Sequence, residues 1–501
     1  LQIKAAEKVR IPVPDNRIAV WAYPLQNGQM KPGGKNLEPF VRNGQLNWTP
    51  REGQWQVITF IAQHHPGTLN PIHPDAGKTV IEKFFQQFEE NTRNQTADGL
   101  NYFFQDELDF GVGDCVWTDD LNAVFKKQKG YDLFEVLPAL FGDLGKITPK
   151  ARLDFMDVKM QLAEERYFKP IFDWHWSRGK IYGCDPGSRG RNPAEFGDYF
   201  RAVRWYTAPG HDTPGGHADL IKGKVSSSIA SLYQRPRVWL EGYHSLGWQA
   251  APERLLFATS ENYLYGCNLL NLHGLYYTTH GSFWEWAPPS YHFRMPYWDH
   301  MEVFLNYFDR LSFLLSQGEL QADIAVMYPV SPMQADMKRD PQKPFRRTMH
   351  HHPGTFSLDP VAYTKTAFES GTELFNNGYD FIFLDHQSLA RAEVEDHHLK
   401  VPGGSYKVLV LPDMKAARWT TIRQALRFYE NGGTVIAVGE LPGASDRAGS
   451  NDPELNAALE KIFGTSSTPS AGETQNRKQT NQAKGIGMIV QDARELTGVV
   501  N

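Results

Sequence analysis

Short apolar runs alternate with longer stretches of helical periodicity between about residues 66 and 320. Strands are expected at residues 100–104, 180–184, 202–206, 237–240 and 269–275. Helices are expected at residues 78–90, 147–167 and 252–265. Such an alternation favours parallel strands joined by crossover helices, and a closed TIM-like (β/α)8 barrel suits it better than an open sheet. The region lacks a Gly-x-Gly-x-x-Gly turn after a first strand, which weakens a dinucleotide-binding interpretation.

The pattern changes on both sides of this region. Residues 1–65 hold extended runs, which are expected to join the barrel or to form an accessory β-region. After the barrel at residues 66–320, strand-like and helix-like runs predict a smaller doubly wound α/β domain over residues 321–465. Residues 466–501 are rich in Ser, Thr, Gln, Asn and Gly, which indicates a linker or the start of a further domain.

Charge and cysteine content exclude several classes of protein. The 501 residues carry a formal net charge of -5, whereas proteins that bind nucleic acid usually carry an excess of positive charge. No uninterrupted apolar run of about 18 residues occurs, so a membrane span is not expected. The 3 cysteines are too few and too scattered for a disulfide framework. The chain starts at Leu1 without a signal peptide, and both ends resemble those of a processed or truncated product.

Aromatic residues are numerous, with 13 Trp, 21 Tyr and 30 Phe. Many of them lie in polar stretches rich in Gly and Pro, where a core does not need them. The apolar faces of sugars stack on aromatic rings, so these clusters suit a saccharide cleft. An aromatic-rich core is the alternative, and composition alone does not separate the two.

The strand expected at residues 100–104 leads directly into Asp106 and Glu107. In a barrel of this kind, catalytic groups project from the C-terminal ends of the strands. Side chains alternate along a strand, so only one of these two acids can face a shared cleft. A solvated strand end or a helix N-cap is the alternative interpretation.

Glu241 ends the strand expected at residues 237–240 and has Tyr243, His244 and Trp248 close by in the sequence. A carboxylate enclosed by aromatic rings loses solvation, which tends to raise its pKa. A structural ion pair is the alternative. Two carboxyl groups from separate strands are what glycosidic cleavage requires, because one protonates the leaving oxygen while the other activates water or attacks the sugar.

Further polar and aromatic side chains near the expected strand ends are predicted to contact substrate. They are Asp106, Trp174, Trp176, Asp185, Trp205, His211, Tyr243, His244, Trp248, His273, Trp284 and Glu285. His211 and His217 with Asp212 lie in what the pattern indicates is a flexible loop, and they are also a possible set of metal ligands. Solvated or hydrogen-bonded loop residues are the commoner case, so the metal ligands are left unassigned.

The order of these features resembles that of the glycoside hydrolase family 106 α-L-rhamnosidases. The series runs from Asp106-Glu107 to Glu241 and Trp248, and the Gly-Tyr-Asp-Leu…Leu-Pro-Ala-Leu segment at residues 130–140 is its most specific part. Similar features include the helix at residues 77–84 and the segment Leu409 to Ile436. The resemblance extends over roughly residues 15 to 440.

The resemblance implies an inverting exo-glycosidase acting on terminal α-linked L-rhamnose of polysaccharides or glycosides. It implies Glu107 as the general acid, Glu241 as the general base, and often a calcium ion near the sugar, although the chemistry itself requires no cofactor. It also implies a periplasmic or secreted protein. Residues 184–217 depart from the family pattern, which leaves another deoxy-sugar or a uronic acid open as substrate. A retaining enzyme and a non-catalytic polysaccharide-binding barrel are the alternatives, and the oligomeric state is not predicted.

Overall fold

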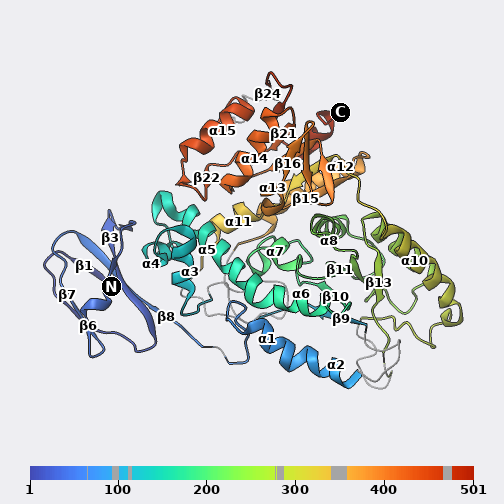
Figure 1. Ribbon diagram of the computed structural model, residues 1–501, viewed down its shortest axis with the longest axis horizontal. Helices are drawn as coiled ribbons and strands as arrows, with labels where there is room; N and C mark the ends of the chain where they lie inside the picture. Colours follow the sequence, from blue (N-terminus) through green and yellow to red (C-terminus); the bar gives the residue numbers. More distant parts are fainter. Residues whose placement is uncertain are drawn as a thin grey trace.

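The structure is a computed structural model in which residues 1–64, 66–92, 101–110, 116–276, 278, 287–339, 358–466 and 477–500 are described. It is a mixed α/β protein with small antiparallel sheets at the N-terminal end and parallel strands in the middle. A larger, mostly parallel sheet follows in the C-terminal third (Figure 1). Within the described ranges, no helix has the length and apolar character needed to cross a lipid bilayer.

The N-terminal sheet is built around β3 (Arg17–Gln26), which pairs antiparallel with β8 (Gln54–Ile61). Its other strands are β1 (Gln2–Lys4), β4 (Gln29–Met30) and β5 (Lys35–Asn36). A second sheet joins β2 (Val9–Pro12), β7 (Gln45–Trp48) and β6 (Val41–Arg42). Both faces of β3 are used: Val20 packs toward the second sheet, whereas Tyr23 packs toward the helices and donates to the carbonyl of Phe134 at 2.5 Å.

Five parallel strands form the centre of the molecule in chain order. They are β9 (Tyr102–Asp106), β10 (Ile181–Asp185), β11 (Gly210–Thr213), β12 (Trp239–Gly242) and β13 (Leu269–Leu272). β9 pairs with β10, β11 pairs with β12, and β12 pairs with β13. A parallel bridge between Gly183 and Ala208 joins the two groups. The parallel arrangement agrees with the sequence pattern, but the described strands do not confirm closure into an eight-stranded barrel.

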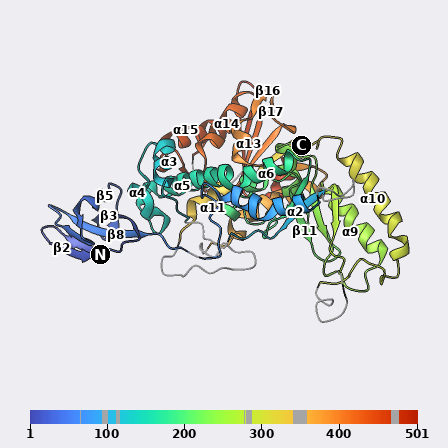
Figure 2. The same cartoon turned by 60° about the horizontal axis from the view of Figure 1, so that its bottom comes forward.

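Helices cover these strands and fill the space toward the N-terminal sheets. They are α1 (Ala76–Val80), α2 (Gln86–Thr92), α3 (Leu121–Lys129), α4 (Leu133–Val136), α5 (Thr148–Ala163), α6 (Lys169–Trp176), α7 (Tyr199–Val203), α8 (Leu220–Leu232), α9 (Pro252–Leu264) and α10 (Met301–Leu315). Figure 2 shows the N-terminal sheets at one end of the molecule and α9 and α10 at the other.

Two local predictions were wrong in this region. Residues 202–206 were expected to be a strand, but α7 and a turn occupy them. Asp198 caps α7 by accepting a hydrogen bond from the backbone of Arg201, and such a cap favours a helix over a strand. Residues 210–213 were expected to be a flexible loop, yet they form β11 and are fully buried.

The C-terminal sheet has the order β15 (Phe381–Leu384), β14 (Ile324–Met327), β19 (Val408–Pro412), β21 (Thr434–Val438), β25 (Ile486–Val490) and β24 (Arg477–Thr480). The first five strands are parallel, and in chain order they follow the 2-1-3-4-5 sequence of doubly wound sheets. The surrounding helices are α11 (Val330–Asp336), α12 (Val361–Asn376), α13 (His386–Ala390), α14 (Trp419–Glu430) and α15 (Pro453–Phe463).

Short strands form two further small sheets in this part of the chain. β16 (Glu393–Glu395), β17 (His398–Val401) and β18 (Gly404–Tyr406) form an antiparallel meander. β20 (Ala416–Ala417), β22 (Ala444–Ser445) and β23 (Gly449–Ser450) form a small mixed sheet.

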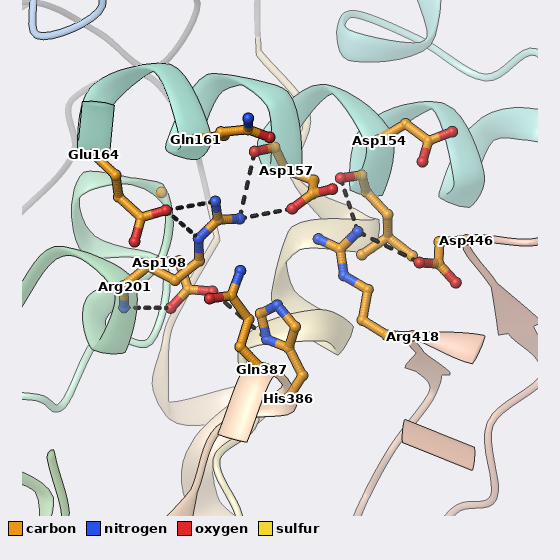
Figure 3. A network of polar contacts seen from close by, with 12 residues as sticks. Asp154, Asp157, Gln161, Glu164, Asp198, Arg201, His386, Gln387, Arg418 and Asp446 are labelled. Carbon is orange, nitrogen blue, oxygen red and sulfur yellow. Dashed lines mark hydrogen bonds and ion pairs between the residues drawn. The ribbon is translucent and has the colours of Figure 1, made fainter. Parts of the chain in front are cut away.

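A buried network of charges joins the central helices to the C-terminal sheet region (Figure 3). Arg201 of α7 binds Glu164 with two hydrogen bonds of 2.6 and 2.9 Å and Asp157 of α5 at 2.7 Å. His386, at the start of α13, lies 3.7 Å from Asp198. Buried charges are tolerated when they are paired, so this network fixes how the two parts of the chain meet.

Candidate active site

The acidic residues expected at the strand ends lie at one edge of the central strands. Asp106 is level with Asp185 across β9 and β10, and Asp212 is level with Glu241 across β11 and β12. Because all five strands are parallel, their C-terminal ends point the same way. Side chains of alternate strands share a layer in barrel-like sheets, which explains how Asp185 of β10 meets Glu241 of β12.

Asp106, Asp185 and Glu241 form a cluster of three carboxyl groups. Each offers one oxygen, and the three oxygens lie within 4.8 Å of one another. Asp185 is 1% exposed and Glu241 is 5% exposed. Asp185 Oδ1 and Glu241 Oε2 accept no hydrogen bond from any described residue. Buried acceptors in native proteins normally have a donor, so this cluster is arranged to take protons or a cation.

The same burial perturbs the acidity of the cluster. Desolvation, reinforced by Glu241 and Asp106, raises the pKa of Asp185 to about 10. Desolvation and the nearby Asp106 raise the pKa of Glu241 to about 7. The pKa of Asp106 is also raised, first by desolvation and then by Glu107. Burial and mutual repulsion therefore favour the protonated forms of these carboxyl groups.

Glu107 follows directly on β9 and is held by an arginine. Arg189 Nη2 donates to Glu107 Oε1 at 2.8 Å, and the glutamate side chain is 27% exposed. The same guanidinium binds both oxygens of Asp212, at 2.6 and 2.8 Å. Lys222 Nζ reaches Asp212 Oδ1 at 3.1 Å. Glu107 itself has a φ of 39°, a left-handed conformation that non-glycine residues adopt mainly where surrounding structure imposes it.

Two histidines complete this edge. His244 Nε2 lies 3.7 Å from Asp212, and His273 Nε2 lies 3.9 Å from Glu241. Their rings are 5.3 Å apart between centroids. His244 and Trp248 follow β12, and His273 follows β13, so these half-buried side chains lie on the same side of the strands as the acids. The structure thus brings together Asp106, Glu107, Asp185, Glu241, His244 and His273 as a site, and Trp248 lies in the loop that follows β12.

Three of the predicted tryptophans lie away from this acidic cluster. α6 leads into the start of β10 through a turn in which Lys180 N donates to His175 O, so Trp174 and Trp176 lie near the N-terminal ends of the strands. A five-residue strand spans about 13 Å, which separates them from the acids. Trp205 likewise precedes β11 and donates to Glu164 at 3.0 Å. Trp174 packs against Phe85 and Phe103, whereas Trp176 is 52% exposed.

Two other predicted contacts are buried away from solvent. His211 is 0% exposed, and its ring nitrogens lie 3.2 Å from Ser226 Oγ and 3.4 Å from Asn262 Oδ1. Tyr243 is also 0% exposed and donates to Thr259 at 2.8 Å. Both are buried residues of the core whose polar atoms have partners within the protein. Trp284 and Glu285 lie outside the described residues.

Sequence reasoning missed the two cations of the site. Arg189 belongs to the loop that follows β10, and Lys222 belongs to the first turn of α8. The available signal was an arginine in a short Gly-containing loop, four residues after a strand that ends in Asp185. A positive charge in that position can face the neighbouring strand ends, but its partners depend on the loop conformation.

Comparison with known proteins gives one family and a consistent group of folds. The α-L-rhamnosidase profile of glycoside hydrolase family 106 matches residues 37–347. A protein of Formosa agariphila named "Putative beta-glucuronidase" is 23% identical over 420 residues, which cover 78% of this chain and 32% of that protein.

Two solved structures have similar folds. The rhamnosidase from Novosphingobium sp. PP1Y superposes with a TM-score of 0.67 at 16% identity and covers 95% of this chain and 45% of its own. A catalytic mutant of Gan42B, a GH42 beta-galactosidase from G. stearothermophilus, superposes with a TM-score of 0.58 at 12% identity and covers 88% of this chain and 73% of its own.

The clustered strand-end carboxyl groups and these similarities place the chain among the glycoside hydrolases. The family match includes more than half of the chain. The chain belongs to glycoside hydrolase family 106. It spans about a third of the length of the curated relative and less than half of the rhamnosidase.

Proposed function

We propose that the protein is an inverting exo-glycosidase that releases terminal α-L-rhamnose, or a closely related sugar, from polysaccharides or glycosides. The observation that carries this proposal is that Glu107, directly after β9, and Glu241, of β12, each lie close to Asp106 at one edge of the parallel strands. Membership of family 106 supports the rhamnoside as substrate. We also propose that β9 to β13 belong to a (β/α)8 barrel, as their parallel order supports, and that the protein acts in the periplasm or outside the cell.

In this proposal Glu107 donates a proton to the leaving oxygen, and Glu241 removes a proton from the attacking water. Glu107 is suited to the first task because part of its side chain is exposed and can meet the substrate. Glu241 is suited to the second because burial raises its pKa to about 7, where a carboxylate is an effective general base near neutral pH. Inversion requires the two carboxyl groups to stand roughly 6.5–9.5 Å apart, so that water fits between one of them and the sugar.

The acidic cluster also fits a calcium ion, which we propose as a structural partner of the substrate site. Asp106, Asp185 and Glu241 offer three oxygen ligands, the type that calcium prefers, and two of the buried oxygens lack a donor among the described residues. A calcium ion held by Asp106 and Asp185 would offer coordination to sugar hydroxyls, while Glu241 keeps an oxygen for the proton of the attacking water. His244 and His273 are then available to hydrogen-bond the sugar from the other side of the cluster.

The test uses synthetic glycosides and compares three variants. The purified protein is assayed on aryl α-L-rhamnosides and on an aryl β-glucuronide, with calcium and with chelator. We expect release from rhamnosides, with the β-anomer of rhamnose appearing first in proton NMR. Initial formation of the α-anomer identifies a retaining enzyme. Cleavage of the glucuronide alone overturns the proposed sugar, and binding of oligosaccharides without any release indicates a non-catalytic protein.

The roles of the two glutamates are separated by the leaving group. Glu107→Gln should lose activity on poor leaving groups and keep much of it on activated aryl glycosides, which need little protonation. Glu241→Gln should lose activity on both, by roughly 100-fold or more. Glu253→Gln, an exposed residue of α9, is the matched control and should behave as the wild type. Full activity in Glu241→Gln contradicts the assignment.

A further inference from the structure

We infer that Arg189 is a positioning residue for the proton donor Glu107, an inference that rests on the proposed function. The arginine lies between two carboxylates of different kinds. Asp212 belongs to a buried strand and serves as its anchor, whereas Glu107 is at the exposed end of β9. Arg189 therefore connects the rigid part of the sheet to the residue that has to meet the leaving group.

Asp212, the anchor, is held in place by several polar contacts. Asp212 is 4% exposed and receives two hydrogen bonds from Arg189, through Nε and Nη2. Lys222 adds a contact of 3.1 Å to Oδ1 and another of 3.1 Å to the carbonyl oxygen of Asp212. A bidentate pair between arginine and carboxylate fixes the plane of the guanidinium. The second N–H bond of Nη2 is thereby directed at Glu107, whose Oε1 lies 2.8 Å from Nη2.

The loop that carries Arg189 is also held in place. Arg189 has a φ of 51°, and its backbone N–H donates to Pro186 O at 2.8 Å. Arg189 Nη1 donates to the carbonyl of Gly187, and the neighbouring Ser188 binds Glu195 through its backbone and its hydroxyl. A left-handed conformation at a non-glycine residue persists only where its surroundings determine it, and such positions concentrate at functional sites.

Charge explains why Glu107 needs this partner. Asp106 precedes it in the chain, and the negative charges of Glu107 and Asp212 both raise the pKa of Asp106, so the three carboxyl groups repel one another. Without a cation, repulsion would turn the partly exposed side chain of Glu107 toward water. With Arg189 in place, the carboxyl group stays at the edge of the cluster, and the carboxylate that remains after the proton has passed to the leaving oxygen is stabilised.

The expected effect depends on the leaving group. Misplacement of the proton donor lowers the rate most when the leaving oxygen has to be fully protonated. A displacement of about 1 Å can lower the rate on the order of 100-fold. Arg189→Ala should therefore lower kcat/KM by about 100-fold on alkyl rhamnosides and only a few-fold on dinitrophenyl rhamnoside. Arg189→Lys should recover part of the loss, because an ammonium keeps the charge but cannot bind both carboxylates as the guanidinium fork does.

The experiment measures kcat/KM over a series of leaving groups for the wild type, Arg189→Ala, Arg189→Lys and Glu107→Gln. Added guanidinium ion should restore activity to Arg189→Ala, chiefly on poor leaving groups. Arg191→Ala is the matched control, because it removes an ion pair of 2.6 Å to Asp219 from the same loop and should leave the leaving-group dependence unchanged. Arg189→Lys also keeps the test valid if Arg189→Ala fails to fold.

Failure of this inference differs from failure of the proposed function. If Glu107→Gln steepens the leaving-group dependence while both Arg189 variants lower all rates equally or not at all, Arg189 does not position the donor. If Glu107→Gln leaves the dependence unchanged, Glu107 is not the proton donor and the proposed mechanism itself is wrong.

Discussion

Replacing Arg201 with methionine tests the buried charge network that joins α5 and α7 to the C-terminal sheet region (Figure 3). Arg201 is 3% exposed and donates to Glu164 and Asp157. Methionine keeps much of the apolar stem but leaves both carboxylates short of a partner. Burial alone would raise the pKa of Asp157, yet Arg418, Arg201 and Lys129 together hold it well below its ordinary value.

The magnitude follows from the partners that remain. Asp157 keeps Lys129 at 2.6 Å, and Glu164 keeps Trp205 at 3.0 Å and an ion pair with Arg204. Each carboxylate therefore keeps at least one partner. Removing one partner of a buried ion pair costs about 3–5 kcal/mol, and we expect the loss in the free energy of unfolding to lie near the lower end of this range.

Urea unfolding at pH 7, followed by tryptophan fluorescence and circular dichroism, measures this loss. Arg191→Met is the control, since its partly exposed pair with Asp219 should contribute about 0–1 kcal/mol. Adding Glu164→Gln to Arg201→Met should cost less than the sum of the single changes, because the charge left unpaired is also removed. A loss below about 1 kcal/mol for Arg201→Met would refute the view that this network stabilises the junction.

Three further changes test other parts of the structure. Burial raises the pKa of Asp198 from 3.8 to about 7. The wild type should therefore lose stability as the pH rises between these values, and Asp198→Asn should lose less. Urea midpoints that change equally in both proteins between pH 5 and pH 8 would contradict this. Asp185→Asn should abolish calcium binding in isothermal titration and the stabilisation of about 2.7 kcal/mol expected when calcium reaches 100 times its Kd; undiminished binding would remove Asp185 from the proposed ligands. Gly210→Ala should destabilise the protein by about 1–3 kcal/mol, because its Cβ would lie 2.5 Å from Trp239 O and 2.7 Å from Cys184 O; an unchanged thermal midpoint shows that the strands can shift.

The sequence pattern predicted several elements that have a clear apolar period. The strand expected at residues 180–184 is β10, the strand expected at residues 237–240 overlaps β12, and the helix expected at residues 252–265 is α9. The apolar period of such elements repeats along their length, so the local sequence pattern is sufficient to predict them. The acids at the ends of β9 and β12 were found for the same reason, because an apolar run that stops at a carboxyl group marks a strand end.

Tertiary structure decided the elements and contacts that have no local signal. β11 consists of Gly, His, Asp and Thr, and it is buried only because Ser226, Asn262, Lys222 and Arg189 from other elements satisfy its polar groups. An aromatic residue in the sequence does not reveal at which end of a strand it will lie, and Trp176 lies at the end away from the acids. The chain alone therefore indicated that β9, β10 and β12 end in acids, but not that β11 does. Only the folded arrangement decided that Asp106, Asp185 and Glu241 share one cluster and that Arg189 holds Glu107, because these contacts depend on loops and on strand order rather than on the spacing of residues.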